Sequence, residues 1–167
     1  MLLLAREALP AQARALPRGR YLLLLAMLLL ALLAPDFDFV LSRVLTGRAR
    51  AAHGLFVHSF TAAAVFGVLW GVAAAVLLRL PVLWMALLGA GCYASHVLMD
   101  MLTHGRGVAL WWPLSEERVS VGPVFFGLRH SEPWNVGAHA ITVVTEGAFV
   151  ALVWLASRQL QRWRARP

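Results

Sequence analysis

The chain has 167 residues, of which 60% are hydrophobic and only 14% are charged. Soluble domains are usually about 45–50% apolar and about 25% charged, so this composition excludes an ordinary soluble domain and indicates an integral membrane protein. The net charge of +7 comes from arginine alone, because the chain has no lysine, and the arginines flank apolar stretches instead of forming one basic face. We therefore expect membrane lipid as a partner, and no nucleic acid.

Apolar stretches predict an all-α integral membrane helical bundle with about four transmembrane helices: Tyr21–Ala34, Phe56–Leu78, Leu80–Leu102 and Gly137–Ala156. The first stretch would be only about 21 Å long, against a hydrocarbon core of about 30 Å, and Pro35 follows it as a stop. A retained span would either borrow flanking residues on both sides or lie beside longer neighbouring spans. A cleaved signal peptide is the alternative, but Leu32 stands where cleavage after Ala34 would favour a small residue. In the third stretch, Gly89 and Gly91 predict close helix packing.

The chain divides into three predicted parts. Residues 1–20 form a basic N-terminal segment, interfacial or loosely ordered, residues 21–156 form a single transmembrane domain, and residues 157–167 form a basic C-terminal tail. With four spans, nine arginines lie on the side of the two termini, and six lie on the other side: Arg43, Arg48, Arg50, Arg106, Arg118 and Arg129. The positive-inside rule then predicts that both termini lie in the cytoplasm. We expect a multi-pass protein of a bacterial-type inner (plasma) membrane.

His96, Asp100 and His104 follow one another at spacings of four, so a helix would present them on one face. Ionisable residues in a membrane helix are costly and therefore candidates for function. The predicted topology brings further candidates to the same membrane face, at the ends of the other spans: Asp36, Asp38, His53, His58 and His139. Because imidazole nitrogen and carboxylate oxygen suit zinc and similar ions, we predict a shared divalent-metal site, with zinc as the first candidate. Glu146, deeper in the fourth span, is either an orienting group for a ligand or a hydrogen-bonded intramembrane residue.

Four short motifs occur in a fixed order: Pro35-Asp36-Phe37-Asp38; His53-Gly54 with His58-Ser59; Ser95-His96 with Asp100, Leu102-Thr103 and Gly105; and Trp112-Pro113-Leu114-Ser115. Over roughly residues 30–120 this series resembles the membrane-bound metal-dependent hydrolases of the YdjM type. That family is in turn distantly similar to the zinc-dependent phospholipase C and P1 nuclease group. The resemblance implies a helical bundle, a divalent-metal site and phosphoester hydrolysis. It also implies ligands at Asp36, His58, His96 and Asp100, followed by Asp38 and His53.

The chain departs from the family pattern in two places. The first 45 positions contain neither threonine nor histidine, so the usual Thr-His motif is missing, and Gly54 stands where a basic residue usually follows His53.

The leading functional hypothesis is a membrane-bound metal-dependent hydrolase that cleaves a phosphoester or other ester bond of a lipid or lipid-linked substrate at the outer face. Asp38 is the predicted general base, and His104 or Arg106 would stabilise developing negative charge. The alternative is a non-enzymatic membrane protein with a structural or sensory metal site. A third hypothesis treats the histidines as interhelical hydrogen-bonding groups in a scaffold. Trp111 and Trp112 suit the membrane–water interface.

Overall fold

The computed structural model describes residues 9–47, 56–102, 107–122 and 135–164. These residues are mainly helical, with no strand among them beyond an isolated bridge between Val108 and Val119. In order, the helices are α2 (Ala11–Arg14), α3 (Arg18–Leu33), the 3-10 turn η1 (Ala34–Phe37), α4 (Asp38–Thr46), the 3-10 turn η2 (Phe56–His58), α5 (Phe60–Leu78), α6 (Val82–Met101) and α7 (Val136–Arg164). Four segments within this part of the chain are long and apolar enough to cross a membrane, which confirms the predicted all-α fold class.

The chain forms two compact units. The first comprises Met1–Met101 and Arg106–Ser120, and the second comprises Leu102–Gly105 and Val121–Pro167. Helix α7 belongs to the second unit and contains the whole of the predicted fourth span. It continues to Arg164, so the described part of the predicted C-terminal tail extends this helix.

The first span is longer than the sequence predicts, because it borrows residues on both sides. Helix α3 begins at Arg18, and η1 and α4 continue the helical path to Thr46. The prediction of Pro35 as a stop is therefore only half right: the α-helix ends at Leu33, but the chain does not leave its helical course. Pro35 occupies the start of the 3-10 turn, where its missing N–H would have no helical partner in any case.

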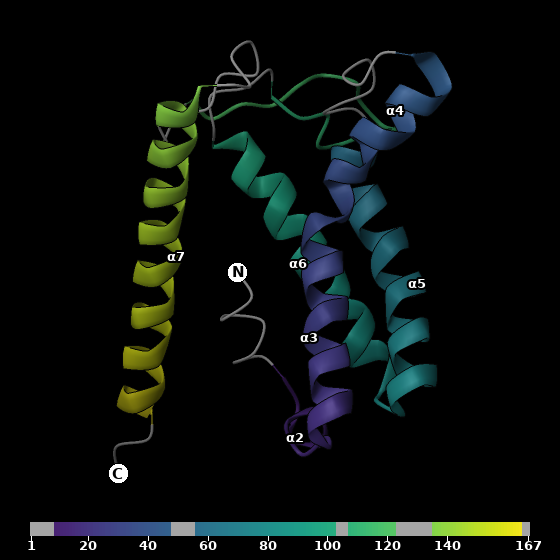
Figure 1. Ribbon diagram of the computed structural model, residues 1–167, viewed down its shortest axis with the longest axis vertical. Helices are drawn as coiled ribbons and strands as arrows, with labels where there is room; N and C mark the ends of the chain where they lie inside the picture. The colour runs from purple at the N-terminus through teal and green to yellow at the C-terminus, as the bar shows by residue number, and fades with distance from the viewer. Residues whose placement is uncertain (1–8, 48–55, 103–106, 123–134, 165–167) are drawn as a thin grey trace. The chain divides into compact units, whose positions relative to one another are not determined.

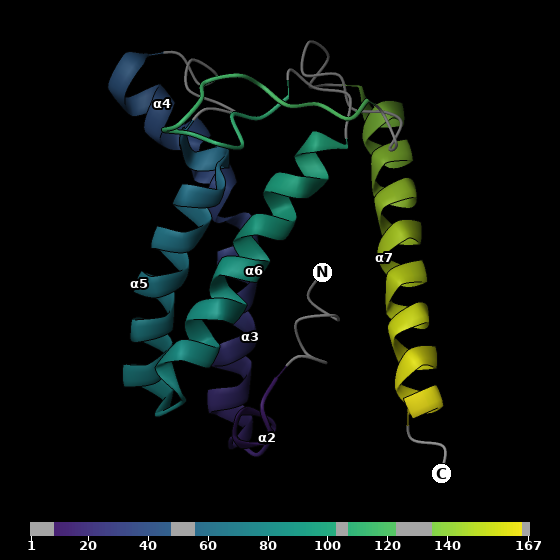
Figure 2. The same cartoon turned by 180° about the vertical axis from the view of Figure 1, so that it is seen from behind.

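Helices α3, α5 and α6 lie side by side in the first unit (Figures 1 and 2). Glycines on α5 allow the backbones of α5 and α6 to approach each other closely. A Cβ atom on Gly67 would lie 2.5 Å from the Cβ of Ala90, and one on Gly71 would clash with the backbone of Ala86. On α6, a Cβ on Gly89 would lie 2.7 Å from the Trp70 ring, whereas Gly91 has no neighbour within 4 Å. The packing role predicted for Gly91 is therefore wrong, because residues two apart on a helix point to nearly opposite sides.

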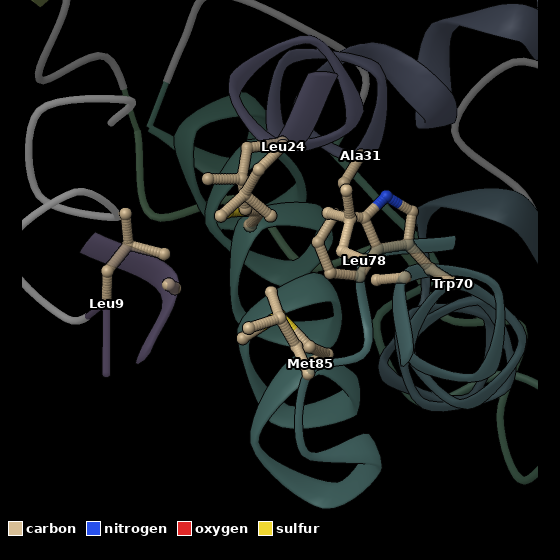
Figure 3. Close-up of a cluster of buried hydrophobic side chains, with 11 residues drawn as sticks. Leu9, Leu24, Ala31, Trp70, Leu78 and Met85 are labelled. Carbon is tan, nitrogen blue, oxygen red and sulfur yellow. The ribbon is translucent and has the colours of Figure 1, made fainter. Parts of the chain in front are cut away.

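A buried apolar cluster joins the three helices (Figure 3). Leu24 and Ala31 come from α3, Trp70 and Leu78 from α5, and Met85 from α6. The Trp70 Nε1 atom donates a hydrogen bond to the Met27 carbonyl at 2.9 Å, which links α5 to α3 inside the apolar layer. In lipid, where the hydrophobic effect does not drive helices together, such packing and hydrogen bonding hold the bundle.

The N-terminal segment adds to this cluster. Pro10 precedes the short helix α2, and both Leu9 and Ala13 are buried against the same core. The described part of the predicted basic N-terminal segment is thus helical and packed, while residues 1–8 lie outside the described residues.

Candidate metal centre

Three separate segments of the first unit meet at one end of the bundle. There α3 passes through η1 into α4, α5 begins just after η2, and α6 ends (Figures 1 and 2). Each segment contributes acidic or imidazole side chains: Asp36 and Asp38 from the first, His58 from the second, and His96 and Asp100 from the third. The structure brings these five residues together, as the sequence predicts.

The nitrogens of the two histidines face the carboxylate oxygens closely. His58 Nε2 lies 3.1 Å from Asp100 Oδ2, and His96 Nε2 lies 3.5 Å from Asp36 Oδ1 and 3.6 Å from Asp100 Oδ2. One potential ligand atom from each of Asp36, His58 and His96 falls within 4.8 Å of the others. Asp100 adds a fourth donor beside both imidazoles.

These separations suit a shared metal ion. Ligands at about 2.0–2.2 Å from one tetrahedral ion lie about 3.3–3.6 Å from one another, which matches the two distances from His96. Hydrogen bonds between nitrogen and oxygen are usually shorter, about 2.7–3.2 Å. The buried Nε2 of His96 accordingly has no hydrogen bond to any described residue. A donor set of two imidazoles and two carboxylates fits zinc and other borderline divalent ions.

Burial divides the site into a floor and a rim. The side chain of His58 is fully buried and that of His96 is 15% exposed, whereas those of Asp100 and Asp36 are 30% and 47% exposed. The imidazoles therefore form the floor, and the carboxylates face outward. A reactant could approach from the side of Asp36 and Asp100.

Asp38 occupies a different position from the other carboxylates. Its side chain is 1% exposed, and its Oδ2 lies 3.4 Å from Nδ1 of His58, the ring nitrogen opposite Asp100. Asp36 and Asp38 are separated by one residue, yet the first reaches the rim and the second lies behind His58.

Local structure positions the backbone around His58. Ser59 caps α5 by accepting a hydrogen bond from the Ala62 N–H at 3.1 Å, and its hydroxyl donates to the Phe56 carbonyl at 2.6 Å. The Tyr93 hydroxyl of α6 donates to the Val57 carbonyl at 2.7 Å. The sequence analysis did not include Tyr93 among the site residues. Its signal was available, since a tyrosine hydroxyl in an apolar span requires a polar partner.

The segment after α6 closes this end of the bundle. Val108 and Leu110 are buried in a cluster with Ala63, Tyr93 and Val97. The Phe60 N–H donates to the Leu110 carbonyl at 3.0 Å, so this segment is bonded to the first turn of α5. The rings of Phe60 and Trp111 pack edge to face, with their centroids 5.4 Å apart.

The other residues predicted for the site lie in different places. His96 and Asp100 do share one face of α6, as their spacing predicts. Helix α6 ends at Met101, and His104 and Arg106 lie outside the described residues, as does His53. His139 and Glu146 lie on α7 in the second unit.

Comparison with known proteins identifies the family. The model of the YdjM inner membrane protein family matches residues 2–165, nearly the whole chain. Searches of curated proteins and of solved structures found no match. Together with the four apolar helices, the family match confirms the resemblance seen in the motifs: the chain belongs to the YdjM inner membrane protein family and is a multi-pass inner-membrane protein.

Proposed function

We propose that this protein is a membrane-bound metal-dependent hydrolase whose divalent ion is held by Asp36, His58, His96 and Asp100. The observation that carries the proposal is the meeting of one fully buried and one largely buried imidazole with two partly exposed carboxylates, at 3.1–3.6 Å, from segments far apart in the chain. Ionisable side chains within a membrane are energetically costly, so their convergence at one place indicates a functional role.

The geometry around His58 supports a cation between the ring and Asp100. A neutral imidazole carries one proton, and a proton on Nδ1 would point at Asp38, 3.4 Å away. Nε2 then presents a lone pair to Asp100 Oδ2 at 3.1 Å, so that two acceptors face each other. His58 and Asp100 would both serve as ligands of a divalent ion, which would supply the positive charge that the two acceptors lack. In this arrangement Asp38 orients His58 and is not itself a ligand, although the sequence analysis predicted it as ligand and general base.

The exposed rim favours a catalytic site over a structural one. Structural zinc sites are closed by four protein ligands, whereas catalytic sites keep a position for water or substrate. Because Asp36 and Asp100 are partly exposed, water can reach the ion on that side. When bound, the ion would activate water as a nucleophile at neutral pH and polarise a phosphoryl or acyl oxygen. Asp36 and Asp100 would fix the direction of approach, and the imidazole floor would exclude water from behind.

The substrate and the orientation follow from the location of the site. A centre at the end of spanning helices lies at the depth of lipid headgroups, so we propose a phosphoester or other ester bond of a lipid or lipid-linked molecule. The arginine distribution supports cytoplasmic termini and a site at the outer face. His53 remains a sequence-based candidate ligand, and His104 a candidate catalytic residue. Zinc is the first candidate ion.

The test is the metal content of detergent-purified protein, measured by elemental mass spectrometry. The wild type is compared with His96→Ala/Asp100→Ala and with Glu116→Ala, which removes an exposed carboxylate that is not among the proposed ligands. We expect stoichiometric metal in the wild type and in Glu116→Ala, and none in the double variant. Size-exclusion chromatography confirms that all three remain folded.

Activity is then measured on phospholipid vesicles and on a soluble phosphodiester, before and after removal of the metal by a chelator. Hydrolysis that stops on chelation and returns with zinc supports the proposal. Absence of metal after reconstitution with several ions would refute the site. Stoichiometric metal without hydrolysis of any ester would favour the structural or sensory alternative.

A further inference from the structure

Residues 107–120, which we call the strap, form an ordered loop with both of its ends pinned together. Val108 and Val119 exchange backbone hydrogen bonds of 3.1 and 2.9 Å. Gly107 makes this pairing possible, because its φ is +72° and a Cβ there would lie 2.8 Å from the Val119 carbonyl oxygen. Arg118 adds a hydrogen bond to the Gly107 carbonyl at 3.2 Å. The strap therefore has a defined shape from end to end.

The tip of the strap is also ordered by backbone hydrogen bonds. The N–H groups of Leu114 and Ser115 donate to the Trp111 carbonyl at 2.8 and 3.2 Å, and the Trp112 N–H donates to Ala109. The resulting turn, residues 111–114, reads Trp-Trp-Pro-Leu. The shape of this turn determines which of its side chains point outward.

The outward side of this turn is apolar. Leu114 is 90% exposed and Trp111 is 54% exposed, whereas Val108, Ala109 and Leu110 on the inner side are buried. Beyond Ser115, Glu116 and Glu117 are exposed and acidic. The strap thus presents an apolar turn and a charged turn within a few residues of each other.

The strap is attached on both sides of His58. Phe60 contacts Trp111, and Phe56 contacts Trp112 with ring centroids 5.8 Å apart. The apolar turn and the metal centre therefore share one end of the bundle, where the chain leaves the membrane span α6. Tryptophan, present here at positions 111 and 112, is among the residues most suited to the headgroup level.

We propose that residues 111–114 insert into the headgroup region of the leaflet at this end of the protein, while Glu116 and Glu117 stay in water. This anchor holds the metal centre at the level of lipid headgroups. If the proposed hydrolysis is correct, the substrate is then the ester of a membrane-embedded lipid, and a water-soluble ester is a poor substitute. The anchoring itself does not depend on the proposed hydrolysis.

The depth of residues 111–114 in the membrane can be measured with a fluorescent label attached to a single cysteine. Cys92 is the only cysteine and is buried, so Cys92→Ala provides a background for Leu114→Cys and for the control Glu116→Cys. Each is labelled with an environment-sensitive fluorophore in phosphatidylethanolamine/phosphatidylglycerol vesicles. We expect a blue-shifted emission for position 114, quenched by lipids brominated near the glycerol end of the acyl chain, and a water-like emission for position 116. Identical, unquenched emission at both positions would overturn the anchor.

A second measurement separates the anchor from the chemistry. In Leu114→Ser we expect roughly a tenfold loss of hydrolysis on vesicles, because burial of a leucine side chain is worth about that factor. Hydrolysis of a soluble short-chain ester should be unchanged, and metal content should stay stoichiometric. Equal rates for Leu114→Ser and wild type on vesicles would refute the link between anchor and substrate. If no ester is hydrolysed by the wild type, the proposed function fails while the fluorescence result still decides the anchor.

Discussion

Asp38→Ala tests how the buried carboxylate behind His58 contributes to the metal centre. The Asp38 side chain is 1% exposed and its Oδ2 lies 3.4 Å from His58 Nδ1, while the opposite ring nitrogen faces Asp100. Without Asp38, the His58 ring loses the group that selects its protonated nitrogen and its orientation. The proposed ligand atoms of Asp36, His58, His96 and Asp100 are all retained in this variant.

The position of Asp38 behind His58 sets the loss of metal affinity that we expect for Asp38→Ala. Loss of a partner that orients a metal-bound histidine typically lowers metal affinity by about 10–100-fold, which corresponds to about 1.4–2.7 kcal/mol. Asp38→Asn keeps a side-chain oxygen beside Nδ1 but removes the charge, so we expect its metal affinity to fall between those of Asp38→Ala and the wild type. Loss of a proposed ligand such as Asp36 should also change the coordination sphere.

The assay is a competition titration with a chromophoric zinc chelator, combined with the absorption spectrum of the cobalt-substituted protein. We expect Asp38→Ala to bind cobalt more weakly with a spectrum like that of the wild type. Asp36→Ala is the matched control, and its spectrum should differ. Two results would contradict the orienting role: unchanged affinity in Asp38→Ala, or a changed cobalt spectrum, which would make Asp38 a ligand.

Further predictions concern the packing that supports the site. Gly71→Leu places side-chain atoms against the backbone of Ala86, so we expect destabilisation of about 1–3 kcal/mol and a lower unfolding temperature in detergent. Gly91→Leu, where no neighbour lies within 4 Å, should leave that temperature nearly unchanged, and equal effects of the two variants would contradict the packing described for α5 and α6. Tyr93→Phe removes the hydroxyl that donates to the Val57 carbonyl at 2.7 Å, which should cost about 0.5–1.5 kcal/mol. Because this bond positions the turn that carries His58, zinc affinity should fall as well; wild-type affinity in chelator competition would show that the bond does not support the site.

The features of this protein that depend on local pattern can be predicted from its sequence. Long apolar stretches predict spanning helices because backbone groups in lipid must be satisfied within the segment, and the structure confirms four such helices. The spacing of four between His96 and Asp100 predicts a shared helix face because of the helical period, and both side chains reach the centre from α6.

How the segments combine depends on contacts between helices, which the sequence does not reveal. The sequence could not distinguish the roles of Asp36 and Asp38, which differ because the 3-10 turn directs one carboxylate to the rim and the other behind His58. Nor could it show that the helical path continues past Pro35, or that Tyr93 holds the turn before α5. Each of these depends on contacts between residues far apart in the chain, and such contacts are determined by packing between helices, which no local period encodes.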